Sequence, residues 1–431
     1  METMTNRNGC RGNLIVVLAT LVALAGIRPG LAWNQDIEQL RQAAKRGDAE
    51  AQLRLGWMYV DGEEVPQDHG EAARWFRRAA EQGHAEAQGT LGIVYLSGKG
   101  LPKDVQEAVK WFRLAADQGD AQAQFFLGSM HDIGEGVPQD FKEATKWFRL
   151  AAEQGMAEAQ SNLGNMYLQG LGVPKDFREG VKWYRKAAEQ GHVRAQYNLG
   201  SMYYQGKGVP EDDRKAVKWY RKAAEQGMAH AQSNLAHMYY QGRGVANDDR
   251  EAVKWFGRAA EQGLVVAQYN LGHMYHQGRG VAEDDREAVK WYRKAAEQGL
   301  AIAQNNLGIM YDEGRGVTED DRKAVKWYRR AAEQGLAIAQ GSLGTMYATG
   351  SKEVPKDHVK AIAWISLAMA QGHTSASESR GLLPQKYTPE QFAEAQALAA
   401  ELRERLTAEQ VAEAERLAAE LREYIEASQS Q

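Results

Sequence analysis

The sequence is almost free of cysteine, since its single one, Cys10, lies near the start of the 431-residue chain. Cys10 precedes an apolar run from Leu14 to Ile27, which is the wrong place for a lipid-anchored cysteine at a cleavage point. The chain after this segment has no thiol, so disulfides and cysteine metal ligands are excluded there. Its stability must come from a packed core.

Long apolar runs are also scarce, and the run from Leu14 to Ile27 is the one that stands out. Two arginines precede it, and a Pro-Gly-Leu-Ala segment follows. A basic start, a short apolar segment and a small-residue exit are typical of a secretory signal peptide. The run has about 14 residues, whereas a membrane span needs roughly 20. We therefore predict a signal peptide over 1–32, cleaved near Ala32 with Ala25 as the alternative, and an exported mature chain without a membrane span, either periplasmic or secreted.

Two further features are missing. The formal net charge is −4, whereas a dedicated nucleic-acid binder is clearly basic, so we predict no nucleic-acid partner. Ser-x-x-Lys, Lys-Thr-Gly, His-Glu-x-x-His, Gly-x-Ser-x-Gly and a phosphate-binding glycine loop are all absent from the sequence. We therefore predict that the protein is not an enzyme and has no cofactor.

Tryptophan, by contrast, is abundant and regularly spaced. Eight tryptophans follow one another at intervals of 36 residues, and a ninth, Trp364, comes one residue late: Trp75, Trp111, Trp147, Trp183, Trp219, Trp255, Trp291, Trp327. A fixed period between 20 and 50 residues is the signature of a solenoid. We interpret the tryptophans as the buried stripe of a repeated unit rather than as a binding site.

Each unit contains two predicted helices. In the fifth, Ala195, Leu199 and Tyr203 share one helical face, and Trp219 belongs to a second apolar stripe. Asp212 precedes the second helix as an N-cap, and an aspartate recurs at this place in every unit. We expect Gly206 and Gly227, like their equivalents, to end the two helices in the left-handed conformation.

The best-formed copies match a known pattern. The sixth copy reads Ala231-Gln232-x-x-Leu235, then Met238-Tyr239-x-x-Gly242-x-Gly244-Val245, then Ala252-Val253-Lys254-Trp255. It resembles the Sel1-like repeat, a relative of the tetratricopeptide repeat with a longer turn. The resemblance implies an all-α fold, a right-handed α-solenoid of antiparallel helix pairs whose first helices line a concave surface. Cysteine-rich secreted members have been linked to penicillin binding, but this chain lacks their paired cysteines, so that activity is not carried over.

The repeats define the domain organisation. We predict a lead-in helix within 33–47, nine repeats over 48–372, and a partial repeat with C-terminal capping helices over 373–431. The last part contains two Ala/Glu-rich segments, 388–406 and 407–425, that repeat each other at 19 residues. A glutamine series from Gln52 to Gln340 and an asparagine series in the first helices are predicted to form hydrogen bonds between neighbouring repeats.

Function is expected where the repeats differ. By similarity to tetratricopeptide repeats, one stripe of the first helix faces the ligand groove, and in repeats five to seven it is rich in tyrosine and histidine. Tyrosine combines contact area with a polar tip and suits protein recognition. The predicted binding residues are Arg194, Tyr197, Tyr204, His230, His237, Tyr240, Tyr269, His273 and His276. A solvated groove wall without a ligand is the alternative.

Two places in the sequence carry side chains that could bind a metal ion. His237, His273 and His276 are close enough in sequence and repeat register for a zinc site, but adaptable polar contacts explain them better. Paired aspartates such as Asp212-Asp213 begin the second helices of repeats five to eight, where the helix dipole favours acidic side chains. No calcium-loop spacing surrounds them, so we predict no metal site.

The sequence therefore favours an exported, non-enzymatic scaffold that binds a protein or peptide on its concave face. Envelope signalling or assembly and contact with a host protein are both open as settings. The alternative is a cell-envelope enzyme, or an enzyme accessory, in which the solenoid holds glycan or peptidoglycan fragments, because tyrosine-rich grooves also suit sugar stacking.

Overall fold

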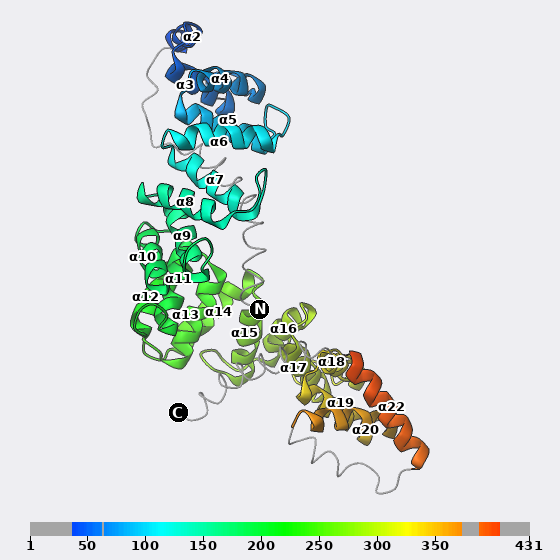
Figure 1. Ribbon diagram of the computed structural model, residues 1–431. Coiled ribbons are helices and arrows are strands. Elements are labelled where there is room, and N and C mark those ends of the chain that lie inside the picture. Colours follow the sequence, from blue (N-terminus) through cyan, green and yellow to red (C-terminus); the bar gives the residue numbers. More distant parts are fainter. Residues whose placement is uncertain (1–36, 63, 373–387, 406–431) are drawn as a thin grey trace. The chain divides into compact units, whose positions relative to one another are not determined.

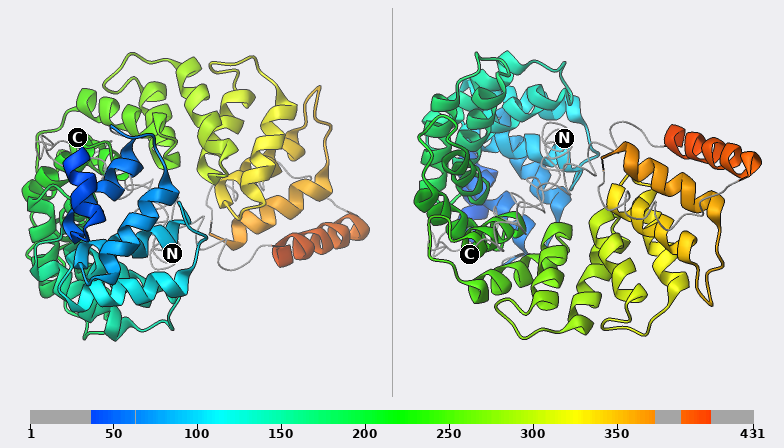
Figure 2. Two further views of the ribbon diagram at one scale, coloured as in Figure 1. Left: turned by 90° about the horizontal axis from the view of Figure 1, so that it is seen from above. Right: turned by 90° about the horizontal axis from the view of Figure 1, so that it is seen from below.

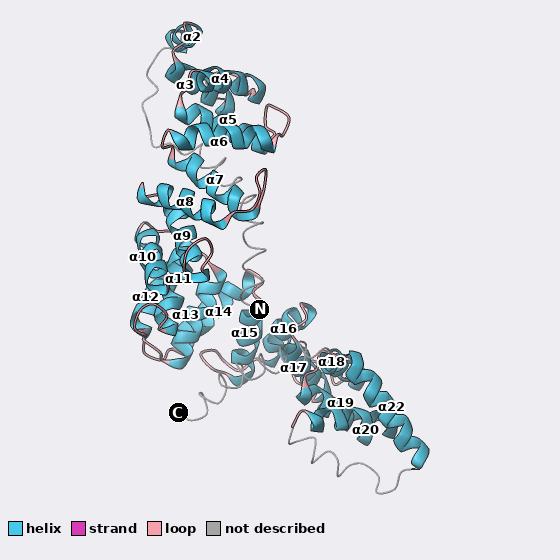
Figure 3. Cartoon of the chain, in the orientation of Figure 1, coloured by secondary structure: helices cyan, strands magenta, loops and turns pink. Residues whose placement is uncertain are grey.

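A computed structural model describes residues 37–62, 64–372 and 388–405. The described residues form 20 helices and no strand (Figure 3). The predicted signal peptide 1–32, the segment 373–387 and the second C-terminal segment 407–425 lie outside the described residues. Among the helices of the described residues, none is both long enough and apolar enough to cross a membrane.

The chain divides into two compact units, 1–211 and 212–431. Within each unit, every described helix packs against the next one along the chain (Figures 1 and 2). This arrangement confirms the predicted all-α solenoid of antiparallel helix pairs. In each repeat the first helix has an odd number and the second an even number, from α3 to α20.

The helices of unit 1 are α2 (Ile37–Lys45), α3 (Ala49–Asp61), α4 (His69–Glu81), α5 (Ala85–Ser97), α6 (Val105–Asp117), α7 (Ala121–Ile133), α8 (Phe141–Glu153), α9 (Ala157–Gln169), α10 (Phe177–Glu189) and α11 (Val193–Gln205). Those of unit 2 are α12 (Asp213–Glu225), α13 (Ala229–Gln241), α14 (Asp249–Glu261), α15 (Val265–Gln277), α16 (Asp285–Glu297), α17 (Ala301–Asp312), α18 (Asp321–Ala332), α19 (Ala337–Thr349), α20 (His358–Ala370) and α22 (Pro389–Arg405).

The helix boundaries follow from local chemistry. Asp176 accepts hydrogen bonds from the backbone N–H groups of Arg178 and Glu179. The corresponding aspartate caps each of the remaining eight second helices. Such a cap satisfies donors that have no partner within the helix. Gly206 and Gly227 have φ values of 63° and 91°, as predicted for left-handed helix ends.

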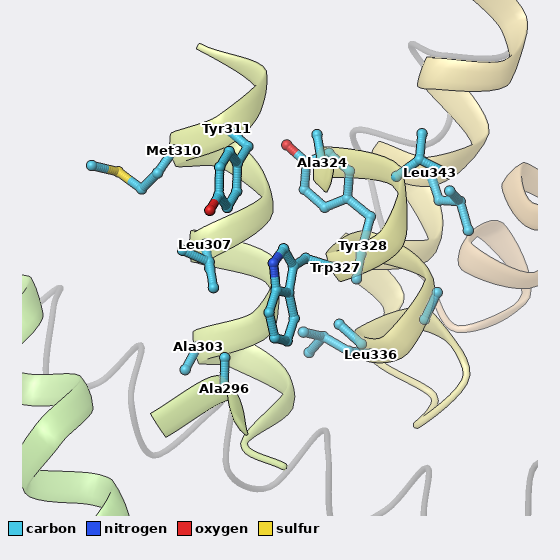
Figure 4. Close-up of a cluster of buried hydrophobic side chains, with 14 of the residues drawn as sticks. Ala296, Ala303, Leu307, Met310, Tyr311, Ala324, Trp327, Tyr328, Leu336 and Leu343 are labelled. Carbon is cyan, nitrogen blue, oxygen red and sulfur yellow. The ribbon is translucent and has the colours of Figure 1, made fainter. Parts of the chain in front are cut away.

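Six of the nine repeat tryptophans are buried, as predicted, whereas Trp111, Trp183 and Trp291 are half-buried. In unit 2, Trp327 lies among Ala303, Leu307 and Leu336 in one buried cluster (Figure 4). Close helix packing depends on a glycine in the first helix, because a Cβ built on Gly308 would come within 2.7 Å of the Tyr328 ring. A larger residue there would therefore overpack the helix pair.

The glutamine series connects neighbouring repeats, as predicted. Gln304 donates a hydrogen bond from Nε2 to the backbone oxygen of Ala296, which ends the preceding repeat, at 3.0 Å. Its Oε1 accepts a bond from Gln334 at 2.7 Å. The same pair of bonds recurs from Gln52 onward, so buried amides satisfy the carbonyls at the end of each second helix.

The last described helix, α22, packs against α20. Its first turn has a threonine cap: the Gln391 backbone N–H donates to Thr388 Oγ1 at 3.2 Å, and Thr388 N–H donates to Gln391 Oε1 at 3.2 Å. This reciprocal pair is a capping box. Ala399 and Leu402 of α22 are partly buried against the core cluster of unit 2.

Candidate partner-binding surface

The nine predicted residues occupy three first helices. Arg194, Tyr197 and Tyr204 lie on α11 in unit 1, whereas the other six lie on α13 and α15 in unit 2: His230, His237, Tyr240, Tyr269, His273, His276. On α11, Arg194 is exposed and the two tyrosines are half-buried. All three α11 side chains are therefore at least partly accessible within their unit.

The six residues in unit 2 divide by burial. His230 is exposed, and His237 and His276 are half-buried. Tyr240, Tyr269 and His273 are 2%, 1% and 7% exposed. The helical period placed these three on the groove stripe, but packing against neighbouring helices covers them. They form the base of the first-helix surface, and their neighbours form its accessible part.

Tyr240 is buried because an arginine covers it. The Arg279 guanidinium lies 4.0 Å from the centroid of the Tyr240 ring. The same guanidinium makes a bidentate ion pair with Asp249, with N–O distances of 3.0 and 2.8 Å. Arg243 and Asp213 make the equivalent pair one repeat earlier. Bidentate pairs of this kind fix geometry as well as adding energy.

These ion pairs were missed by the sequence analysis, which attributed the second aspartate of each pair to the helix dipole alone. Asp213 and Asp249 are the second aspartates, and each binds an arginine 30 residues later, in the next repeat. A signal was present in the sequence. The Gly-Arg-Gly turns of repeats six and seven accompany an Asp-Asp pair in the repeat before.

We use the name α15–α17 polar cluster for five polar residues of α15 and α17, all of them buried except Asn306: Tyr269, Asn270, His273, Asn305 and Asn306. The rings of Tyr269 and His273 are nearly parallel, with centroids 6.2 Å apart. Asn306 Nδ2 donates to the Tyr269 hydroxyl at 3.5 Å. The cluster therefore connects the first helices of repeats seven and eight.

Three buried polar atoms of this cluster have no hydrogen-bond partner among the described residues: His273 Nε2, Asn270 Oδ1 and Asn305 Oδ1. Asn270 and Asn305 are 4% and 1% exposed. A buried polar atom without a partner costs about 1–3 kcal/mol. Three such atoms on two neighbouring helices are therefore a substantial and localised cost.

Two histidines of the surface are held neutral by their surroundings. Burial lowers the pKa of His273 to about 4, and the nearby positive charges of His276 and Arg279 act in the same direction. Burial also lowers the pKa of His237 to about 4, with Arg243 contributing. Near neutral pH both rings therefore offer one donor and one acceptor nitrogen rather than a charge.

His276 is committed to a different contact. Its Nδ1 lies 2.6 Å from Oδ1 of Asp285, the first residue of α16. In the part of the chain that the structure describes, no three His, Cys, Asp or Glu side chains are grouped so as to hold a metal ion. His273 and His276 thus have separate partners: His273 contacts the Tyr292 hydroxyl at 3.4 Å, and His276 contacts Asp285.

Known proteins resemble this chain along most of its length. The family model described as Sel1 repeat matches nine consecutive segments, 49–84, 85–120, 121–156, 157–192, 193–228, 229–264, 265–300, 301–336 and 337–373. A solved structure titled as c5321, a protective antigen present in uropathogenic Escherichia coli strains displaying an SLR fold, is 37% identical, covers 89% of this chain and 98% of its own, and has a TM-score of 0.51. A Sel1 repeat protein from Oxalobacter formigenes is 38% identical over 74% of this chain and 91% of its own, with a TM-score of 0.55.

A curated relative matches over a shorter stretch. The secretory immunoglobulin A-binding protein EsiB of Escherichia coli O6:H1 is 44% identical over 63 residues. The match spans 15% of this chain and 12% of the relative's length.

Proposed function

We propose that this chain, which belongs to the Sel1 repeat family, is an exported, non-enzymatic scaffold that binds a protein or peptide on the surface of its first helices. Sel1 repeats form a scaffold suited to protein–protein interaction. The relative EsiB is named for binding secretory immunoglobulin A, and c5321 is described as a protective antigen. Both names support a protein partner, and they favour contact with a host protein over a role inside the envelope.

The α15–α17 polar cluster carries the proposal. Its three buried atoms without partners destabilise the free protein. A peptide whose backbone N–H groups reach Asn270 and Asn305 when the covering side chains rearrange would supply the missing donors. His273 Nε2 adds a donor or acceptor beside them. The exposed His230 and Val266, which is 38% exposed, provide accessible contact area on the same stripe of α13 and α15.

Specificity follows from the same cost. A site built around buried polar groups rejects ligands that leave those groups unpaired. The partner is therefore expected to bind as an extended segment with free backbone groups, not as a purely apolar surface.

The glycan alternative has weaker support. Sugar stacking needs an accessible aromatic face, and Tyr240 and Tyr269 are buried, with Tyr240 already covered by Arg279. Muropeptides and glycan fragments belong in the binding experiment as competitors. Competition by these fragments, but not by peptide, would favour the alternative.

A paired histidine experiment tests the proposal. His273→Ala should abolish specific capture of a partner by the full chain, whereas His131→Ala should leave it intact. His131 is the matched control because it is a buried histidine on α7 in unit 1, and its Nδ1 also lacks a partner among the described residues. Circular dichroism must show that both variants remain helical. Equal capture by the two variants would refute a site at His273.

A second variant separates binding from folding. Asn305→Leu replaces a buried oxygen that has no partner with an apolar group of similar size, so it should raise the free energy of unfolding by about 1 kcal/mol. The same change should weaken capture of the partner. Unchanged capture with raised stability would show that Asn305 does not take part in binding.

Export has its own test. The predicted signal peptide makes Trp33 the first residue of the mature protein, which mass spectrometry of the protein recovered outside the cytoplasm would detect. A mature protein that begins at Met1 would refute export by this route, without affecting the binding proposal.

A further inference from the structure

Most second helices carry an ion pair between a basic residue and the glutamate three residues before it, and α12, α18 and α20 lack this pair. In α20 the basic residue is absent as well, because Ala363 stands at its position. In five of these helices a lysine binds the glutamate three residues before it: Lys110 with Glu107, Lys146 with Glu143, Lys182 with Glu179, Lys254 with Glu251, and Lys290 with Glu287. In α12 and α18 the glutamate is replaced by Lys215 and Lys323. These lysines bind the N-cap aspartates Asp212 and Asp320 instead, at 2.8 and 2.7 Å.

The replacement leaves two lysines without their usual carboxylate. Lys218 of α12 and Lys326 of α18 stand at the position that is paired in the other helices, and neither has an ion-pair partner among the described residues. Each helix thus has one additional lysine in place of the glutamate, and a second lysine, Lys218 or Lys326, that has lost its carboxylate partner. The change converts a locally neutral helix surface into a positive one.

A cavity lies at each of these two places. The cavity at α18 has a volume of about 530 Å³, and its walls carry six cationic side chains against two carboxylates. Lys326, Arg330 and Lys356 are among the cationic side chains, and Val325 and Val354 provide apolar wall. The cavity at α12 has a volume of about 540 Å³ and carries four cationic side chains against one carboxylate. Both lie where a second helix meets a loop of the following repeat.

Some of these cations already have partners. Arg329 donates to the Tyr347 hydroxyl, and Arg221 donates to the Tyr239 hydroxyl at 2.7 Å. Such arginines are structural, because the same contact recurs in other repeats, for example between Arg149 and Tyr167. The excess charge at each cavity therefore comes mainly from the lysine freed by the lost glutamate and from the cations beside it.

We propose that the α12 and α18 cavities form a second docking surface, which binds acidic segments of a protein partner. Carboxylates complement the unpaired lysines, and the methylene groups of Asp and Glu side chains pack on the valines of each wall. This surface belongs to the second helices. It is independent of the first-helix surface, and the two proposals fail separately.

The distribution of charge favours an acidic protein over nucleic acid. A nucleic acid presents phosphates continuously and is matched by a continuous basic stripe. Between α12 and α18, the corresponding lysines of α14 and α16 are neutralised by Glu251 and Glu287. The chain as a whole has a net charge of −4. Among these second helices of unit 2, the lysines released from this pair, Lys218 and Lys326, therefore lie at two separate cavities and not along a continuous stripe.

The test restores the common pattern. The double variant Lys215→Glu, Lys323→Glu gives α12 and α18 the glutamate of the other helices, so Lys218 and Lys326 become paired. The probe is a short fluorescent polyglutamate peptide, titrated into the full chain at low salt and followed by anisotropy. The double variant should bind the peptide roughly tenfold more weakly than the parent chain, and added salt should weaken the parent's binding. Both changes are at exposed positions, so circular dichroism should not change.

A gain-of-function variant completes the experiment. Glu287→Lys in α16 reproduces the α12 and α18 pattern in another repeat, so it should tighten binding of the peptide. Lys290→Glu in the same helix is the matched control, because it alters a lysine that is already paired. Binding to the double variant with unchanged affinity, or no binding to the parent chain, would overturn the proposal. If the parent chain binds a single-stranded oligonucleotide with the same affinity as the peptide, the surface recognises polyanions in general, and the proposal of an acidic protein partner is overturned.

Discussion

A single hydroxyl group should measurably stabilise unit 2 when it is added at Phe256. Repeat seven shows how such a hydroxyl is used: that of Tyr292 lies 3.4 Å from His273 Nδ1 and hydrogen-bonds Asn306 on the next first helix. It thereby connects two first helices through one second helix. Tyr184 contacts Asn198 in the same way in unit 1.

Repeat six lacks this hydroxyl. His237 and Asn270 stand where repeat seven has a histidine and an asparagine, but Phe256 replaces the tyrosine. The consequence is visible at Asn270, whose Oδ1 is buried without a hydrogen bond. A new hydrogen bond contributes about 0.5–1.5 kcal/mol, and satisfying a buried acceptor removes part of a cost of about 1–3 kcal/mol. We expect Phe256→Tyr to raise the free energy of unfolding by about 1 kcal/mol.

Urea titration and thermal unfolding, followed by far-ultraviolet circular dichroism, measure this change. For a unit of this size, 1 kcal/mol corresponds to a rise of about 2–4 °C in the unfolding midpoint. The gain should disappear in the Asn270→Ala background, because the new hydroxyl then has no acceptor on α15. Destabilisation by Phe256→Tyr, or a gain that persists in the Asn270→Ala background, would refute the reasoning.

Three further outcomes are expected. Gly308→Ala should lower the free energy of unfolding by about 1–3 kcal/mol, because the added Cβ would lie 2.7 Å from a tyrosine ring. Gly257→Ala should raise it by about 0.5–1 kcal/mol, because nothing lies within 4 Å of the added Cβ. Thermal unfolding should therefore show midpoint shifts of opposite sign for the two variants. Stability should fall as the pH drops from about 6.5 towards 4, because His237 and His273 stay neutral in the folded state, with a pKa of about 4, while the unfolded chain binds protons from about 6.5 downward. Each histidine should account for a loss of about 3 kcal/mol in the free energy of unfolding by about pH 4. Changing both histidines to Gln should therefore make the free energy of unfolding from urea titrations depend less steeply on pH between about 6.5 and 4. Glu64→Gly should stabilise unit 1 by about 1 kcal/mol in the same assay, since Glu64 has a φ of 58°, and an unchanged midpoint would contradict the strain argument.

The sequence was sufficient to predict the regular features of the fold. A period of 36 residues, an aspartate before each second helix and a glycine after each helix are local signals. The structure confirms the helices, the caps and the burial of six of the nine repeat tryptophans. The glutamine series could be predicted as well. A repeated buried amide needs a repeated partner, and the structure supplies it in the carbonyl eight residues earlier.

The surface could be predicted less well, for physical reasons. Helical periodicity states which direction a side chain takes, but not whether a neighbouring repeat covers it. Tyr269 follows the predicted stripe and is nevertheless 1% exposed, because it packs against Tyr292 with ring centroids 5.7 Å apart. The ion pair between Asp249 and Arg279 depends on two residues 30 positions apart, which a reading of single helices does not connect.

Equivalent positions in different repeats of this chain can be compared directly, because they occupy the same place in the fold. Positions 53, 125 and 269 are equivalent to 305, and there the chain has Leu53, Phe125 and Tyr269, each at most 3% exposed. The same fold therefore accepts large, well-packed side chains at this position. Asn305 has an oxygen without a partner in the same buried setting, which stabilises the free protein less than these alternatives. Local rules of packing fail mainly at functional sites, so this departure, which Ser161 shares in repeat four, is an argument for a ligand at α17 where it lies beside Asn306 and Tyr269.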